Sequence, residues 1–190
     1  MQEAIQTQTT KPLLYPAPPA ADEKMVQEIF RGIEEFVGFV PDGLRLYGIS
    51  PPLLENYVRN IVYFNQGGTT LPRPLCVMIR YLVSWNAGCS FCIDLNEAFL
   101  TSMNYSLDEI RAARNNPDLA PLEKNERALL KLAVRSVDEP DRISEADIEQ
   151  VRHYGWTDRE IFDAVAQAAS NRSFNSVLRT FKVEHQGAFA

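Results

Sequence analysis

Apolar residues recur every three or four positions along most of the chain from residue 22 onward, which is the period of an amphipathic α-helix. We find no convincing β-hairpin signal and no internal repeat. The pattern therefore predicts an all-α fold. The clearest apolar stripe consists of Val26, Ile29, Phe30, Ile33, Phe36 and Val37.

Local signals place the ends of the expected helices. Ser50 followed by two prolines is typical of a helix start, and the pairs Ser106/Glu109 and Thr157/Glu160 fit a capping box. The β-branched residues of 71–86 would also allow a strand, but we favour a helix there. The helices that we expect span residues 22–37, 51–65, 71–86, 89–103, 106–115, 121–137, 144–154 and 157–181.

Residues 1–21 differ from the rest, since they are polar and include four prolines in the run PLLYPAPPA. Such a segment favours an extended arm without a core of its own. The arm is either mobile or packed on a neighbouring subunit through Leu13, Leu14 and Tyr15. Residues 22–190 have the length and apolar content expected of a single all-helical domain.

Composition narrows the possible partners and location. The net charge is −6, from 19 basic and 25 acidic residues, and no basic cluster stands out, so we expect no nucleic-acid partner. No apolar run reaches the roughly 18 to 20 residues that cross a bilayer, and the start lacks the pattern of a secretory signal. Three cysteines, two of them in one CxxC, fit a reducing compartment. We therefore expect a cytoplasmic protein that does not contact a membrane.

The stretch SWNAGCSFCIDLNEAF carries the strongest chemical signal. Cys89 and Cys92 stand at positions i and i+3 at the start of an expected helix, so they share one face. The helix dipole and the free backbone amides at that end favour a thiolate, which is the nucleophile in peroxide reduction and in disulfide exchange. The small neighbours Ala87, Gly88 and Ser90 should leave both sulfurs accessible.

Three interpretations of this pair remain open: a redox-active dithiol, two ordinary buried or vestigial thiols, and half of a zinc site. Zinc usually takes four ligands, while His153 and His185 are distant in sequence and no second CxxC is present. A thioredoxin fold is disfavoured because the pair lies between helices. No nucleotide-binding glycine motif and no serine-hydrolase elbow is present. We expect no metal and no cofactor.

The segments VSWNAGCSFCIDLNEAFLTSMNYSLDEI and YGWTDREIFDAVAQAASNRSFNSVLRTF resemble alkylhydroperoxidase-D-like proteins of the carboxymuconolactone decarboxylase superfamily, and most of all its peroxidase-related members. The resemblance covers roughly residues 40–185. It implies a multi-helix bundle, a homo-oligomer and a dithiol that reduces hydroperoxides. It also implies that Cys92 attacks and that Cys89 resolves the intermediate, whereas the helix terminus alone would favour Cys89, which should be the more exposed sulfur.

The resemblance further implies a glutamate and a histidine that relay protons to the dithiol, and this chain lacks both. Val77 stands at the glutamate position and Asn96 at the histidine position. Asn96 shares a helix face with Cys92 and can support it by hydrogen bonding, but it is not a base near neutral pH. Another glutamate, such as Glu55 or Glu126, would have to take over the relay.

The remaining polar and aromatic residues near the dithiol have structural interpretations. Asp94 and Glu97 should face solvent, and Cys76 should be a core residue. Trp85 and Phe91 should be core residues or the wall of a pocket. For Asn171, Arg172 and Asn175 we expect a hydrogen-bond network between subunits, with an anion-binding Arg172 as the alternative.

The sequence thus favours a thiol-dependent oxidoreductase in which Cys89 and Cys92 reduce a hydroperoxide or exchange disulfides. Its partners would be a small hydroperoxide or hydrophobic substrate and a dithiol electron-donor protein. The alternative is a catalytically degenerate oligomeric or ligand-binding module of the same fold. A carboxymuconolactone-type decarboxylase is the least favoured interpretation, because such relatives generally lack the CxxC.

Overall fold

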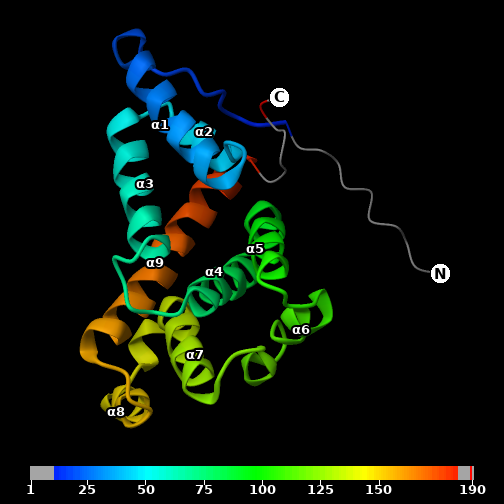
Figure 1. Ribbon diagram of the computed structural model, residues 1–190, viewed down its shortest axis with the longest axis vertical. Coiled ribbons are helices and arrows are strands. Elements are labelled where there is room, and N and C mark those ends of the chain that lie inside the picture. The colour runs from blue at the N-terminus through cyan, green and yellow to red at the C-terminus, as the bar shows by residue number, and fades with distance from the viewer. Residues whose placement is uncertain (1–10, 184–188, 190) are drawn as a thin grey trace, which may run out of the picture. The chain divides into compact units, whose positions relative to one another are not determined.

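The computed structural model of the chain describes residues 11–183 and residue 189, and over these residues it is all-helical, as predicted (Figure 1). None of the helices in this part is long and apolar enough to cross a membrane. The α-helices are α1 (Glu23–Val37), α2 (Asp42–Tyr47), α3 (Pro51–Asn65), α4 (Arg73–Ala87), α5 (Ser90–Ser102), α6 (Leu107–Ala112), α7 (Lys124–Asp138), α8 (Glu145–His153) and α9 (Asp158–Thr180), with 3-10 turns η1 (Ala20–Asp22), η2 (Pro117–Leu119) and η3 (Pro140–Arg142).

The expected helices are present, with small shifts at their ends. Both predicted capping boxes form, since Ser106 accepts from the Glu109 amide and the Glu160 amide donates to the Thr157 hydroxyl over 3.3 Å. The helix expected from residue 121 begins only at Lys124, because Glu123 caps it in a further capping box. The structure also contains α2, which the apolar pattern did not predict because the helix has only 6 residues.

The segment 71–86, for which a strand was the alternative, is the helix α4. Pro72 precedes it as N-cap and Pro74 lies in its first turn, where no backbone donor is needed. Most of its side chains are buried. A helix that is apolar on nearly all sides belongs inside a protein rather than on its surface. The buried residues of α4 are Leu75, Cys76, Val77, Met78, Ile79, Tyr81, Leu82, Val83, Ser84 and Ala87.

The chain divides into two compact units. The first contains the described residues of 1–56 and 178–190, with α1 and α2. In it the Leu13 amide donates to the Phe181 carbonyl over 2.9 Å, so the proline-rich arm is tied to the end of its own chain. Docking of the arm on another subunit stays a prediction, as does the single domain expected for residues 22–190.

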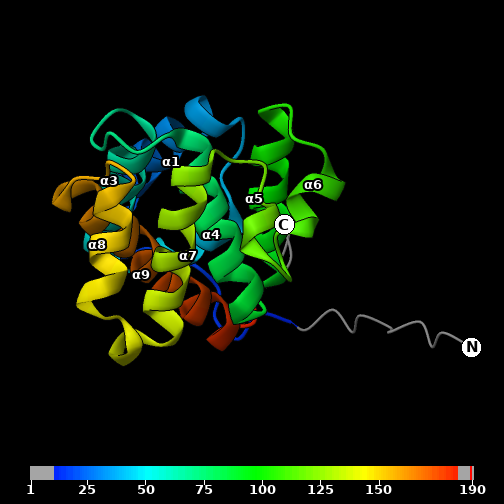
Figure 2. The same cartoon turned by 90° about the horizontal axis from the view of Figure 1, so that it is seen from below.

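The second unit, residues 57–177, contains both cysteines of the CxxC. Figures 1 and 2 show α4 between α5 and α7 in this unit, and the three helices share one apolar core. Leu75 and Ile79 of α4 and Leu129 and Leu130 of α7 are fully buried there.

The later part of α3 runs antiparallel to α9 within the same unit. The rings of Tyr57 and Phe174 stack with centroids 4.5 Å apart. Farther along, the Ser170 hydroxyl donates to Asn60 over 3.1 Å, and the Tyr63 hydroxyl donates to the Asp163 carboxylate over 3.0 Å. These contacts fix the register of α9, which carries two asparagines towards α4.

Candidate functional site

The dithiol lies at the sharp turn between α4 and α5. Gly88 ends α4 in the left-handed conformation with φ of 65°, which a side chain would disfavour. Cys89 follows as the N-cap of α5 in an extended conformation, and Cys92 lies in the first turn of α5. The two sulfurs are therefore held on one face at the positive end of a 13-residue helix.

Both sulfurs are buried, contrary to the expectation that small neighbours would leave them accessible. Cys89 is 0% and Cys92 2% exposed, so neither is the more accessible of the two. The cysteines of the described residues are free thiols. The reason for the burial within this unit is that Cys92 points inward, towards polar groups of α4 and α9.

These polar groups are Ser84 of α4 and Asn171 and Asn175 of α9. The Asn171 amide donates to the Ser84 hydroxyl oxygen over 3.0 Å, and the Asn175 amide does so over 3.2 Å. Ser84 in turn donates to the Arg80 carbonyl over 2.7 Å. Ser84 and Asn175 also lie close enough to the Cys92 thiol to act on its pKa. The expected network between subunits is thus a network within one chain, and it supports the dithiol.

The pKa of the Cys92 thiol is raised well above its ordinary value. The main cause is its hydrogen bond to Cys89, followed by burial and by the charge that Cys89 can carry, while the hydrogen bonds of Asn175 and Ser84 act in the opposite direction. Cys92 therefore keeps its proton near neutral pH.

Asn96 and Arg80 form a second set of contacts beside the dithiol. The Asn96 side-chain amide donates to the Cys92 carbonyl over 2.7 Å, and its oxygen accepts from Arg80 Nε over 3.1 Å. Asn96 thus holds the guanidinium next to the first turn of α5. Arg80 is close enough to Cys92 for their charges to interact, and it forms no ion pair with a carboxylate of the described chain.

Sequence reasoning missed Arg80. Its only signal was a cation within the apolar stretch LPRPLCVMIRYLVSWN, where most neighbours are core residues. Burial lowers the pKa of Arg80, and neighbouring groups, including Cys76 and Cys92, raise it in part. Since an arginine stays protonated in proteins, the site has a permanent positive charge. Val77 and Cys76 are core residues, 1% and 0% exposed, and burial raises the pKa of Cys76 to about 11.

Glu97 is buried, although we expected it to face solvent. It is 6% exposed and accepts hydrogen bonds from Tyr81 (2.8 Å), Arg111 (2.9 Å) and Arg114 (2.5 Å). The helical wheel of α5 alone could not show that α4, α6 and the residues just after α6 cover this face. Burial acts to raise the pKa of Glu97, but Arg111, Tyr81 and Arg114 outweigh it and the pKa is lowered.

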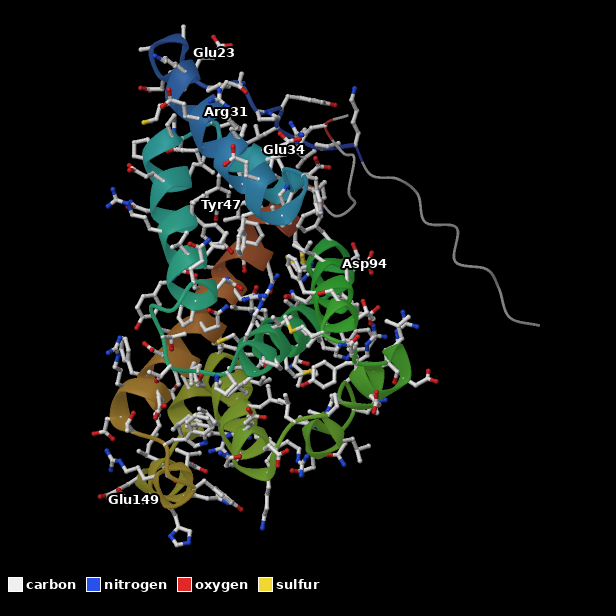
Figure 3. All side chains as sticks on the ribbon, viewed as in Figure 1. Glu23, Arg31, Glu34, Tyr47, Asp94 and Glu149 are labelled. Carbon is white, nitrogen blue, oxygen red and sulfur yellow. The ribbon has the colours of Figure 1, made fainter. Side chains whose placement is uncertain are left out.

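The other candidates have structural surroundings. Asp94 is exposed on the outer side of α5 (Figure 3), and Glu126 accepts from the Glu123 amide over 2.9 Å in the cap of α7. Phe91 is buried, whereas Trp85 is 39% exposed and lies under the Arg114 guanidinium, 4.0 Å from the ring centroid.

Two further expectations concerned metal and anion binding. Arg172 lies 3.6 Å from the Asp138 carboxylate, so its nearest charged partner is internal. Across the described residues, no three His, Cys, Asp or Glu side chains gather as metal ligands would.

Comparison with known proteins supports the fold. No family model and no curated protein matches the chain. An uncharacterized peroxidase-related protein from Silicibacter sp. TM1040 matches with a TM-score of 0.81 and 24% identity over 97% of this chain and 96% of that one. A second, from Ralstonia eutropha JMP134, described as an alkylhydroperoxidase AhpD core, matches with a TM-score of 0.80 and 20% identity over 95% of each chain.

The debrominase Bmp8, in complex with 2,3,4-tribromopyrrole, matches with a TM-score of 0.74 and 19% identity over 95% of each chain. The chain therefore has the all-α fold of alkylhydroperoxidase-D-like proteins, and the resemblance found in the sequence is confirmed for the fold. Peroxidase-related proteins and a debrominase share this fold, so the fold leaves the reaction open.

Replacement of the buried carboxylate in Glu97→Gln should lower the free energy of unfolding by about 3 kcal/mol at pH 7, because it leaves Arg114 without its charged partner. The folded-state pKa of Glu97 is lowered, so its contribution is present above the unfolded pKa and is lost as pH falls through the folded pKa. Urea unfolding at pH 7 and below pH 4 measures both effects. Asp94→Asn is the control, and equal stability of the two variants at pH 7 would contradict the buried cluster.

Proposed function

We propose that the protein is a thiol-dependent oxidoreductase in which Cys89 and Cys92 cycle between dithiol and disulfide. The observation that carries the proposal is that both thiols are buried together at the start of α5, where Cys92 lies next to the polar groups of Ser84 and Asn175. An ordinary core cysteine has no need of such partners. Two thiols in contact at a helix N-terminus are arranged to share a proton and then a bond.

In the proposed reaction Cys92 attacks the terminal oxygen of a hydroperoxide as a thiolate. The O–O bond breaks, Cys92 becomes a sulfenic acid, and the alkoxide leaves as an alcohol after taking up a proton. Cys89 then attacks the Cys92 sulfur, which forms the disulfide and releases water. The peroxide gains the two electrons that the dithiol loses. An external dithiol, such as an electron-donor protein, would return them by thiol–disulfide exchange.

Arg80 takes part of the role that the missing relay residues have in the family. Val77 cannot carry a proton, and Asn96 cannot act as a base. A fixed positive charge beside Cys92 stabilises negative charge on the attacking sulfur and on the leaving oxygen, without itself moving a proton. General acid–base help is commonly worth about 100- to 10,000-fold in rate, so we expect a slow enzyme at neutral pH.

The substrate side of the proposal is an organic hydroperoxide or another hydrophobic electrophile. Phe91 is a buried aromatic residue between the two cysteines, and an apolar wall suits an organic molecule better than a polar one. As in the resembled family, we propose that the protein works as a homo-oligomer in the cytoplasm.

The direct test is stopped-flow mixing of the reduced protein with cumene hydroperoxide, with free thiols counted before and after. We expect the loss of two thiols in the native chain, no disulfide in Cys89→Ser or Cys92→Ser, and unchanged behaviour in Cys76→Ser. A thiol count that stays at three in the native chain contradicts the proposal. If Cys89→Ser alone stops the first step, Cys89 and not Cys92 is the attacking sulfur.

The rate of this reaction should rise with pH. Because the pKa of Cys92 is raised, its thiolate fraction is small at pH 7 and grows about tenfold per pH unit until the pH reaches that pKa. We expect a continuous rise from pH 7 to pH 9.5. A plateau reached below pH 8 would show that the attacking thiol has a lowered pKa and that our description of the site is wrong.

The burial of both sulfurs favours a second candidate, a ligand-binding module of the same fold without turnover. The two candidates predict different numbers of free thiols after the protein has reacted with peroxide. A module would bind a hydrophobic ligand equally well with Cys89→Ser and Cys92→Ser and would lose no thiols to peroxide. A decarboxylase of the carboxymuconolactone type would likewise keep its activity without the cysteines.

A further inference from the structure

A groove lies between α7 and α8, with Asp118 of the short turn η2 in its lining, and has a volume of about 520 Å³. This is within the range of roughly 300 to 1,000 Å³ that small-molecule sites occupy. None of its lining residues belongs to the dithiol site. Figures 1 and 2 both show α8 and α5 on different sides of α4 and α7.

The wall formed by α7 is basic. Lys124, Arg127, Lys131 and Arg135 all line the groove, spaced at intervals of three and four residues along one helix. This concentration of cations is unusual in a chain whose net charge is −6. Apolar side chains of both helices complete the lining, so the groove has room for a carbon skeleton beside a charged group.

Two of these cations are already neutralised. Lys131 Nζ lies 2.6 Å from the Asp118 carboxylate, and an Arg135 Nη lies 2.5 Å from the Asp147 carboxylate. The remaining Nε–H of Arg135 is buried and has no hydrogen-bond partner. A buried donor without an acceptor favours an additional oxygen ligand at this place.

The other two cations have no carboxylate partner in the described chain. Lys124 Nζ lies 5.8 Å from the centroid of the Tyr154 ring, and Arg127 donates to the main-chain carbonyls of Ala120 and Leu122. With two neutralised pairs and two free cations, the groove has a formal charge of +2. Coulomb attraction in a partly enclosed site then selects a ligand with opposite charge.

We propose that the groove between α7 and α8 binds a small organic anion with at least two negative charges on oxygen. Lys124 and Arg127 supply the charge, and Arg135 supplies a hydrogen-bond donor. A phosphate ester and a di- or tricarboxylate share this chemistry. The site is independent of the dithiol, so it exists whether or not Cys89 and Cys92 turn over.

The test is isothermal titration calorimetry of the full chain with pyrophosphate and with citrate, in KCl at matched ionic strength. Lys124→Gln/Arg127→Gln should weaken binding by about tenfold or more, because two charge-assisted contacts are lost. The matched control is Lys24→Gln/Arg31→Gln on α1, which removes the same charge from an exposed helix (Figure 3) and should leave binding unchanged.

Arg127 also holds main-chain carbonyls, so a second variant guards against a folding defect. Lys124 is exposed and has no hydrogen bond in the structure, so Lys124→Glu should fold normally. Because this change reverses the charge, it should weaken the binding of pyrophosphate more than Lys124→Gln does. Tighter binding of pyrophosphate assigns the site to phosphates, and tighter binding of citrate assigns it to carboxylates. No binding of either probe at millimolar concentration, equal weakening in the control, or unchanged binding in Lys124→Glu would overturn the proposal.

Discussion

The burial of α4 is the constraint on which the candidate site depends. Because α4 is covered on nearly all sides, its position and rotation are set by core packing, and Gly88 then fixes the direction in which the chain leaves it. The start of α5, with both cysteines, follows from these two facts. Ser84 and Arg80 lie on the same helix, so the packing that orients α4 also orients the groups that contact the dithiol. A rigid helix is a more accurate support for such a site than a loop.

The polar groups inside this core are organised into two clusters with different roles. Glu97 with Tyr81, Arg111 and Arg114 satisfies its charges internally and joins α5 to α4 and to the residues after it. The cluster around Cys92 instead combines neutral hydrogen-bond partners with a cation that has no carboxylate partner. Burial raises the pKa of Tyr81 to about 12 in the first cluster, where a fixed proton stabilises the fold. In the second, burial and the neighbouring Cys89 raise the pKa of the Cys92 thiol.

Apart from the short helix α2, the helices and the position of the two cysteines could be predicted from the sequence, because both depend on local patterns. Apolar periodicity placed α1 and α9, and capping residues placed the starts of α6 and α9. The CxxC motif predicted that Cys89 and Cys92 lie together at the start of a helix, as they do in α5. What the sequence could not show was tertiary: that Asn171 and Asn175 reach across to Ser84, that Arg80 is held by Asn96, and that Glu97 is covered. Each of these contacts joins residues of different helices, so the helical wheel of a single helix cannot show it.

The most direct measurement of the central claim is the equilibrium of the full chain with glutathione redox buffers, followed by alkylation, intact mass and peptide mapping. The account expects one reversible two-electron step that yields a Cys89–Cys92 disulfide. Cys76 should remain a free thiol, and therefore be alkylated, at every ratio of oxidised to reduced glutathione. Cys89 and Cys92 that remain free thiols in fully oxidised glutathione, in protein that has kept its fold, would contradict it.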